Sequence, residues 1–431
     1  MVRRLISNAP EFAADFAALM SDKRAGNTAL GERVRMIISQ VRERGDEALL
    51  EFAARFDGVA PKSLRVGDDE IEAAEASCAP EALAALDLAA DRIMRFHRRQ
   101  LPADERYTDE VGASLGWRWT PIDSVGLYVP GGTASYPSSV LMNAVPARVA
   151  GVERVVMVTP ARDGRINPLT LAAARRAGIT EIYRVGGAQA VAALAFGTAS
   201  IAAVDKIVGP GNAYVAEAKR LVFGVVGIDS VAGPSEILVI ADDANDPDWI
   251  AADLLSQAEH DASSQSILMT DSFHFAEQVE AAVERALARL PRAAIAGASW
   301  RDFGAIIVVD DLTEAAELSN RIAPEHLELA VETPEALLKH VRHAGAIFLG
   351  RFTPEAMGDY IAGPNHVLPT SRTARFSSGL SVLDFLKRST LLSLTSAGAA
   401  KLGPAAITLA EAEGLQAHAR SIAARMPERD L

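Results

Sequence analysis

Gln257 and His260 are a pair of side chains whose types and spacing suggest chemistry. They lie near the end of a segment, residues 248–261, whose pattern predicts a helix, and residues three apart on a helix share a face. An amide oxygen and a neutral imidazole on one face could give a metal ion two ligands. A capped helix end with an ordinary polar surface explains the same residues, and for this pair alone it is the favoured interpretation; the placement of the other histidines bears on the choice.

Glu325 and His326 are adjacent titratable residues at a point where a loop leads into a strand. An imidazole can remove a proton near neutral pH, and a carboxylate can activate water, so the two could act as separate bases in different steps. The alternative is a carboxylate that caps a neighbouring segment beside a packed ring. The residues themselves favour neither interpretation.

Further imidazoles lie beside carboxylates in two later segments. Asp359 and His366 share a glycine-rich loop, and Glu413 precedes His418 in the C-terminal tail. Loops held by a rigid sheet are where reactive groups usually project. A mixed nitrogen and oxygen site could combine these segments with the helix end, and zinc would suit it ahead of manganese or iron, although the spacing is too wide for a motif. Its members would be Gln257, His260, Asp359 and His418.

The other four histidines are not candidates. They are expected to lie on polar faces of helices, in contact with solvent, and they are His97, His274, His340 and His343.

Two junctions between a strand, a glycine turn and a helix are candidate phosphate sites, at residues 185–190 and 208–213. Free N–H groups and the helix dipole favour a phosphate at such a helix start. Neither junction matches the full dinucleotide fingerprint, because the third glycine is missing. A tight turn with a purely structural role remains the alternative.

Composition restricts the class of protein. The 431 residues carry a net charge of −13 and form no basic stripe, so nucleic-acid binding is not expected. Cys78 is the single cysteine, which excludes internal disulfides and a thiolate zinc cluster and fits a reducing cytoplasm. The first residues lack the apolar core of a signal peptide, and no apolar run is long enough to cross a bilayer.

Strands and helices alternate from about residue 117 to residue 349. Buried β-branched strands between helices predict parallel sheets with right-handed crossovers. The pattern divides into two α/β units near Gly233 and Pro234, and the helices expected over residues 8–98 are predicted to pack on the second unit. Past Pro369 the chain has few large apolar side chains, with helices expected at 381–388 and 405–424. Such a tail makes a poor core and must lie on its own body or on a second subunit.

Nine short stretches, in order along nearly the whole chain, resemble the histidinol dehydrogenase family. They are YVPGG at 128–132, GGAQA at 186–190, VGPGN at 208–212, AGPSE at 232–236, SQAEH at 256–260, PEHL at 324–327, GDY at 358–360, NHVLP at 365–369 and EGL at 413–415.

The resemblance implies a zinc enzyme that oxidises L-histidinol to L-histidine through the aldehyde, using two NAD+ molecules. It implies that Glu325 and His326 accept protons. Zinc, one per subunit, would be held by Gln257, His260, Asp359 and His418, and the dinucleotide would be met by Tyr128, Gln189 and Asn212. The implied substrate contacts are Ser235, Gln257, His260, His326, Asp359, His366, Glu413 and His418.

The same resemblance implies a cytoplasmic homodimer with shared active sites, in which the tail completes the partner's site. The expected fold is α/β, with two doubly wound, incomplete Rossmann-like domains, an N-terminal helical arm and a small C-terminal helical tail. The expected divisions are an arm at 1–22, a first α/β domain at 23–120 plus 235–370 carrying the zinc and base residues, an NAD-binding domain at 121–234, and a tail at 371–431.

Other functions fit part of the pattern. A related dehydrogenase could act on another small alcohol such as a sulfonated diol, but His366 and Glu413 are the groups expected to hold the imidazole and amine of histidinol. A zinc hydrolase could use Glu325 to activate water without a dinucleotide, and a non-catalytic metal-binding module would need no base.

Overall fold

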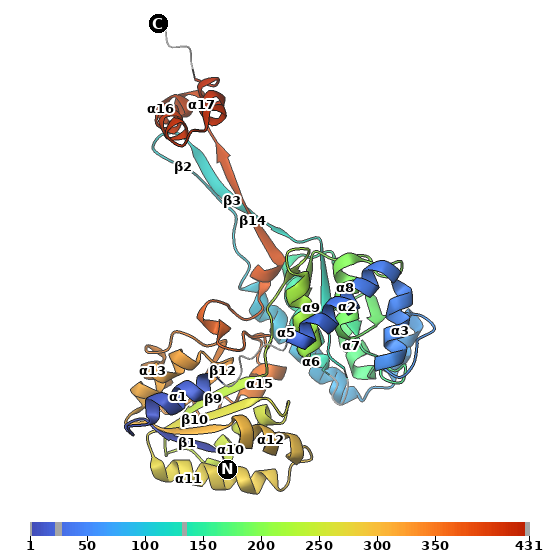
Figure 1. The fold of residues 1–431 in the computed structure, drawn as a ribbon, viewed down its shortest axis with the longest axis vertical. Coiled ribbons are helices and arrows are strands. Elements are labelled where there is room, and N and C mark those ends of the chain that lie inside the picture. The colour runs from blue at the N-terminus through green and yellow to red at the C-terminus, as the bar shows by residue number, and fades with distance from the viewer. Residues whose placement is uncertain (1, 22–27, 132–135, 427–431) are drawn as a thin grey trace.

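Two parallel sheets, each covered by helices on both faces, make up the body of the computed structural model, which describes residues 2–21, 28–131 and 136–426 (Figure 1). One sheet has six strands and the other has five, and a third, antiparallel sheet of three strands projects from the body. The predicted α/β class is confirmed. Among the described residues, no helix is both long and apolar enough to span a membrane.

The five-stranded sheet has the order β6-β5-β4-β7-β8. The chain moves from β4 outward to β6 and then returns to the other side of β4, so the direction of winding switches between β4 and β7. In open α/β sheets, ligands bind at such a point, beyond the carboxyl ends of the strands. The strands are β4 (Ser124–Tyr128), β5 (Arg154–Thr159), β6 (Glu181–Arg184), β7 (Lys206–Val208) and β8 (Gly227–Ile228).

Helices from two parts of the chain cover this sheet. One face carries α2 (Thr28–Arg44), α3 (Asp46–Phe56), α8 (Gly187–Phe196) and α9 (Ala213–Val222). The other carries α4 (Asp68–Ala76), α5 (Pro80–Arg98), α6 (Pro137–Ala150) and α7 (Pro168–Arg176), with the 3-10 turn η2 (Val382–Phe385) beside them.

The six-stranded sheet has the order β1-β11-β10-β9-β12-β13. Its winding switches between β9 and β12, which are paired in parallel with His326 opposite Ile237. The strands are β1 (Arg3–Ile6), β9 (Glu236–Ala241), β10 (Gln265–Thr270), β11 (Ala305–Val308), β12 (His326–Ala330) and β13 (Ala346–Leu349). The helices are α1 (Phe12–Ser21), α10 (Pro247–Ala258), α11 (Phe273–Leu287), α12 (Ala293–Phe303), α13 (Leu312–Ile322), α14 (Pro334–Leu338) and α15 (Glu355–Tyr360).

The N-terminal helices differ from the prediction. Val34, Ile37 and Phe52 are buried in the core of the five-stranded sheet, together with Val156 and Val191. The helices of residues 28–98 therefore belong with residues 124–228 and not, as expected, with 235–370. Their amphipathic pattern predicts a buried face, but it carries no information on which of two apolar sheets that face will cover.

The N-terminal arm also differs. Arg3–Ile6 is strand β1 at the edge of the six-stranded sheet, so only the later part of the expected helical arm, Phe12–Ser21, is helical. Leu5 and Phe16 are buried in that sheet's core. The segment is therefore part of the unit built on the six-stranded sheet, which we call the second unit; the unit built on the five-stranded sheet is the first. Residues 1 and 22 of the expected arm lie outside the described residues.

The tail is built on a projecting sheet rather than on helices alone. Strand β14 (Leu386–Ser393) pairs antiparallel with β3 (Ser114–Pro121), which also pairs with β2 (Glu105–Thr108). The helix expected at 381–388 is wrong, since this stretch is a 3-10 turn followed by a strand. The sheet ends in α16 (Ser396–Ala412) and α17 (Gln416–Ala423), which stand well away from the body (Figure 1). We call this part of the molecule, residues 105–121 and 386–426, the projecting arm; a further turn, η1 (Thr373–Arg375), precedes it.

Candidate functional site

His326 is the first residue of β12, and its ring is almost completely buried. Its Nδ1 lies 3.0 Å from the carbonyl oxygen of Glu236, an atom that can only accept, so Nδ1 carries the hydrogen. The other nitrogen, Nε2, then has a free lone pair, and it has no hydrogen-bond partner among the described residues. Burial lowers the pKa of His326 to about 3, which keeps the ring neutral and its Nε2 unprotonated at neutral pH.

Two carboxylates face Nε2 of His326 from α15. Glu355 and Asp359 each have an oxygen 3.8 Å from this nitrogen. Burial raises the pKa of Asp359 to about 7. The pKa of Glu355 is raised well above its usual value, first by burial and then by the nearby charge of Asp359. The start of α15 is anchored on β12, because the Glu355 N–H donates to the Glu328 carboxylate at 2.6 Å.

Glu325 lies on the opposite side of the imidazole ring. Its Oε2 accepts from the Glu236 N–H at 2.9 Å and lies 3.7 Å from Nδ1 of His326. Gln257, which is fully buried at the end of α10, satisfies its neighbours when its nitrogen donates to Glu355 (2.6 Å) and its oxygen accepts from the Glu236 N–H (3.1 Å). The peptide groups of Glu236 thus hold Glu325, His326 and Gln257 together.

His366 connects the two units of the body. Its Nδ1 donates to the carbonyl oxygen of Asp359 (3.0 Å), and its Nε2 lies 3.2 Å from the hydroxyl of Ser139, at the start of α6. Burial lowers the pKa of His366 to about 4, and the charge of His260 also lowers it. His260 likewise lowers the pKa of His326, so all three imidazoles belong to one cluster.

A cavity of about 390 Å³ lies over this cluster, between the two units. Phe96 of α5 and Gln100, just beyond the end of that helix, line it from one unit, while His326, Asp359 and His366 line it from the other. The cavity therefore lies at the amino ends of β12 and β13, and His366, which lines it, contacts Ser139 at the start of α6.

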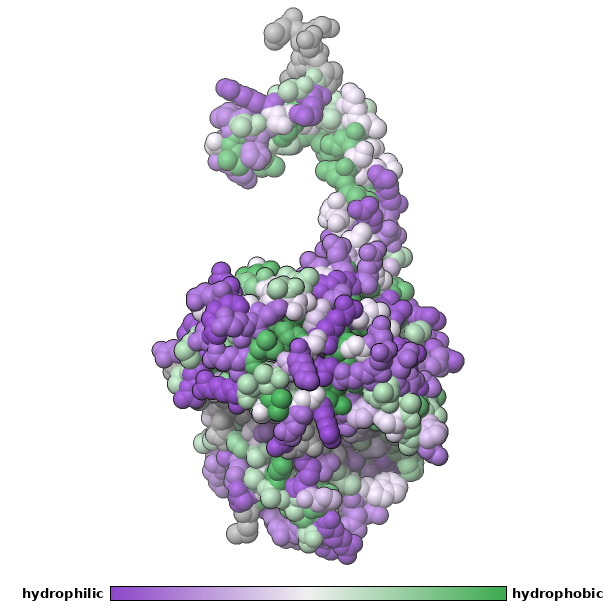
Figure 2. Space-filling model, turned by 90° about the vertical axis from the view of Figure 1, so that its right-hand side faces the viewer, coloured by the Kyte–Doolittle hydropathy of each residue, from purple (hydrophilic) through white to green (hydrophobic). Residues whose placement is uncertain are grey.

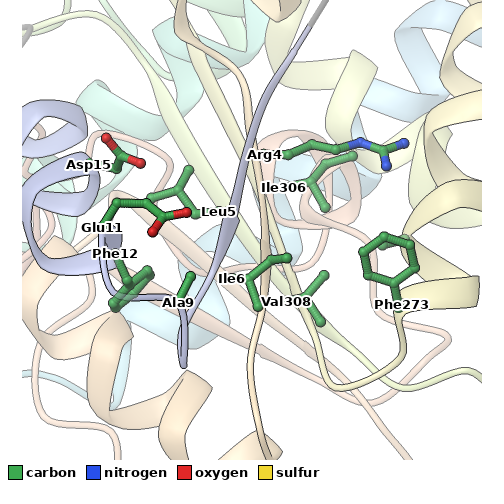
Figure 3. A pocket seen from close by; sticks show the side chains of 11 residues that line it. Arg4, Leu5, Ile6, Ala9, Glu11, Phe12, Asp15, Phe273, Ile306 and Val308 are labelled. Carbon is green, nitrogen blue, oxygen red and sulfur yellow. The ribbon is translucent and has the colours of Figure 1, made fainter.

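A second hollow, of about 200 Å³, contains no such cluster. It lies beside the edge strand β1 and is lined mainly by apolar side chains, including Leu5, Ile306 and Phe273 (Figure 3). The guanidinium of Arg4 at its rim pairs with Glu280. It offers no acid–base chemistry of the kind seen in the first cavity.

The residues expected to meet a dinucleotide lie at the carboxyl edge of the five-stranded sheet. Tyr128 ends β4, and its hydroxyl accepts from the Gly187 N–H at 3.0 Å. Gln189 is buried in the first turn of α8, and Asn212 caps α9, accepting from the N–H groups of Tyr214 and Val215. Several amides that the glycine turns would offer to a phosphate are therefore engaged within the protein. Gly132, the last residue of the YVPGG stretch at 128–132, lies outside the described residues.

Glu413 and His418 are not near this cavity within the same chain. Both are exposed, at the end of the projecting arm (Figure 1). Of the expected metal ligands, Asp359 faces His326, Gln257 contacts Glu355, and His260 is close enough to affect the pKa of His326, while His418 lies apart from them. Ser235 also lies at the site, directly before Glu236. Residues 427–431 of the expected tail lie outside the described residues.

The donor set of the cluster fits a metal ion. Within the described part of the chain, His326, Glu355 and Asp359 offer ligand atoms within 4.8 Å of one another. Burying several ionised carboxylates together costs free energy unless a cation lies among them and balances their charge. This set has only Asp359 in common with the expected ligands, since it contains neither His260 nor the amide of Gln257, and His418 lies on the projecting arm.

Sequence reasoning missed Glu355, Glu236 and Ser139. A usable signal existed for Glu355, since it precedes Asp359 by four residues and the two share a helix face. The expectation for His97 is wrong: it is fully buried on α5, with Nδ1 2.7 Å from Gln100 Oε1. His274 and His340 are exposed as expected, and His343 is half-buried.

Fold and site together define an α/β enzyme with an acid–base centre between two parallel sheets. The family model for histidinol dehydrogenase matches residues 20–426. Histidinol dehydrogenases of Rhodospirillum rubrum and Rhizobium meliloti are each 63% identical to this chain, over 99% and 96% of both chains respectively. The crystal structure of histidinol dehydrogenase from Elizabethkingia anophelis superposes with a TM-score of 0.94, at 39% identity and with 98% of each chain covered. The chain belongs to the histidinol dehydrogenase family and is an oxidoreductase.

Proposed function

We propose that this chain oxidises L-histidinol to L-histidine through L-histidinal, with zinc and two NAD+ molecules, as the last steps of histidine biosynthesis in the cytoplasm. The observation that carries the proposal is the neutral imidazole of His326. Its Nε2 is unprotonated, and the residue lines a cavity between the two units, where a substrate held by one unit can meet a dinucleotide held by the other.

His326 is the proton acceptor in both oxidations. Its Nε2 takes the proton of the histidinol hydroxyl in the first step and that of the aldehyde hydrate in the second. Glu325 accepts a proton from the water that hydrates the aldehyde. In each oxidation the C–H bond breaks with its electron pair, and bound NAD+ supplies the acceptor for that hydride.

Zinc, when bound, supplies a fixed positive charge that orients the substrate's amine and imidazole. Gln257, His260 and Asp359 would hold it, with His418 as the fourth ligand. The buried amide of Gln257 supports this assignment, because Glu355 accepts from its nitrogen, and its oxygen, which accepts one N–H from Glu236, has a second lone pair for a cation. Under this assignment Glu355 supports a ligand and His326 remains a base.

The dinucleotide site lies at the carboxyl edge of the five-stranded sheet, where Tyr128, Gln189 and Asn212 are proposed to contact NAD+. Tyr128 is support for this location, since it ends β4 beside the winding switch and holds the glycine turn before α8. Ser235 and His366 would contact the substrate from the second unit.

Two copies of the chain would complete each other's sites. The projecting arm carries exposed apolar side chains, and Figure 2 shows apolar surface along it, some of it facing the gap between the arm's tip and the body. Apolar surface of this kind marks an interaction site. Leu392, Leu402 and Leu409 would be covered in a homodimer, and Glu413 and His418 would reach the partner's cavity.

The decisive experiment adds L-histidinol and NAD+ to the purified protein and follows NADH absorbance together with product. Two NADH per histidinol consumed, loss of activity after chelation and recovery with zinc would support the proposal. A protein that releases product without forming NADH would instead be a hydrolase. Activity only with another small alcohol would indicate a different substrate.

A further inference from the structure

A buried ion pair lies beside the loop that follows β7. Lys219 on α9 and Asp229 after β8 pair their side chains, which are 2% and 4% exposed. Neither residue lines the acid–base cavity. Taking two opposite charges out of water costs free energy, and apolar residues of similar size often serve stability equally well, so the pair needs a reason beyond stability.

The pair holds both backbone groups of Gly209, the first residue of the loop. Lys219 Nζ donates to the Gly209 carbonyl oxygen at 2.9 Å, and the Gly209 N–H donates to Asp229 Oδ2 at 2.7 Å. Hydrogen bonds to charged groups are about twice as strong as neutral ones. Gly209 therefore has a charged hydrogen-bond partner at both its N–H and its C=O group.

Gly209 itself is a close-contact position. Its φ is +114°, and a Cβ built on it would lie 2.2 Å from the carbonyl oxygen of Tyr128. The hydrogen bonds from the ion pair thus hold the loop of residues 209–212 in close contact with the carboxyl end of β4. The other end of the loop is held by the side chain of Asn212, which caps the same helix that carries Lys219.

We propose that Lys219 and Asp229 are positioning residues for the dinucleotide, setting the loop of residues 209–212 against Tyr128 at the winding switch. The inference rests on the proposed NAD+ site. Because the two charges neutralise each other, the pair does not attract a phosphate by charge. It fixes the backbone that a bound dinucleotide meets, and loss of the pair should weaken dinucleotide binding while leaving the substrate's site intact.

The test is the double variant Lys219→Met/Asp229→Leu, which removes both charges without leaving one unpaired in the core. The matched control is Lys206→Met, which removes a half-buried lysine from β7. The Nζ of Lys206 contacts Asp384 and not the loop. NADH binding is titrated calorimetrically in each protein, alongside KM for NAD+, KM for histidinol, zinc content and the midpoint of thermal unfolding.

The expected result is at least a tenfold weaker NADH affinity and a tenfold higher KM for NAD+ in the double variant. Histidinol KM should change less than twofold, zinc content should be unchanged, and the control should match the unaltered protein. NADH binding equal to that of the unaltered protein would overturn the positioning role, as would a parallel loss of NADH binding, histidinol affinity and thermal stability. If the unaltered protein itself binds no NADH, the NAD+ proposal fails first and this inference with it.

Discussion

His326 donates its Nδ1 proton to the Glu236 carbonyl oxygen, from the first residue of one strand to the first residue of its parallel neighbour. This single bond decides which nitrogen is basic and aims it at the cavity. Because the two strands are adjacent in the sheet, the ring is held by backbone that cannot move without breaking the ladder. The N–H of the same residue, Glu236, donates to the Glu325 carboxylate, so the backbone of one residue holds both proposed proton acceptors.

Glu325→Gln should separate the two halves of the reaction. Only hydration of the aldehyde needs an activated water, so the single-turnover rate starting from histidinal should fall by 10²- to 10⁴-fold. The rate of the first oxidation, starting from histidinol, should fall less than tenfold. Rapid-mixing measurements of NADH formation from each starting compound would check this.

The control is Glu332→Gln, which alters an exposed carboxylate just after the end of β12 and should leave both rates unchanged. Glu325 lies behind the ring, on its Nδ1 side, and it could serve only to orient His326. Equal losses in both half-reactions would assign it that orienting role and remove it as the base for water.

Asp359→Asn and Glu355→Gln should differ in metal content, although both acids lie 3.8 Å from His326. Under the proposed ligand set Asp359 binds zinc directly, so its amide variant should lose the metal on dialysis. Glutamine at 355 can still accept from Gln257, and zinc should remain near one per subunit, with affinity reduced by 10- to 100-fold at most. Elemental analysis after dialysis would check both.

The reverse result would redefine the centre. If Glu355→Gln loses zinc as completely as Asp359→Asn, then the geometric group of His326, Glu355 and Asp359 is the metal site. His326 could not then act as a free base, and the proton acceptor would have to be sought elsewhere in the cavity.

Most of the parallel strands were predictable from sequence, because each is a short β-branched or apolar run that local pattern identifies without tertiary information; the edge strands β1 and β8 were not. Residues 155–159 and 237–240 are examples, and both fall within observed strands. Strand β14 was not predictable, since LKRSTLLS does not alternate and becomes extended only by pairing with β3, some 270 residues earlier. Its partner decides its conformation.

Some residues of the cluster around His326 were predictable from sequence, but its geometry was not. His326 and Asp359 belong to recognisable motifs, whereas the support from the Glu236 peptide depends on β9 and β12 being neighbours. His97 was misjudged because α5 has a charged sequence, yet α5 is packed against α6 and the loop that carries Asn365, so its His97 face is buried. A helix buried on more than one side does not show a simple polar face.

His97→Gln should flatten the dependence of stability on pH. Burial lowers the pKa of His97 below its usual value of about 6.5, so below that pH the unfolded chain binds a proton that the folded chain does not. Stability is therefore lost as pH falls through about 6.5, by up to about 1.4 kcal/mol per pH unit for one proton. The unfolding midpoint of the variant should fall less between pH 7 and pH 5 than that of the unaltered protein.

The comparison between the two proteins is needed because nearby acids act in the opposite direction. The raised pKa of Asp359 favours the folded state at low pH, but this contribution is common to both proteins and cancels. The matched control is His274→Gln, at an exposed position on α11. An identical pH dependence in the unaltered protein and the His97 variant would contradict the prediction.

Two variants that are each inactive as homodimers should regain activity when combined in one hybrid dimer, if the projecting arm completes the partner's site. A hybrid dimer of one His418→Asn chain and one Asp359→Asn chain contains one cavity with an intact Asp359 and the intact partner's tail. Its other cavity lacks both groups. The hybrid should therefore show about half the activity of the unaltered dimer, while each parent variant alone is inactive. Two affinity tags allow the hybrid to be purified and assayed for NADH formation.

A second hybrid is the control, because it reverses the expectation. It joins an unaltered chain to a chain carrying both Asp359→Asn and His418→Asn. If sites are shared, each of its cavities lacks one group and the hybrid is inactive; if each chain used its own tail, one cavity would be complete and half the activity would remain. Activity in this second hybrid, with none in the first, would show that the arm folds back onto its own body, and Glu413 and His418 would then act within a single chain.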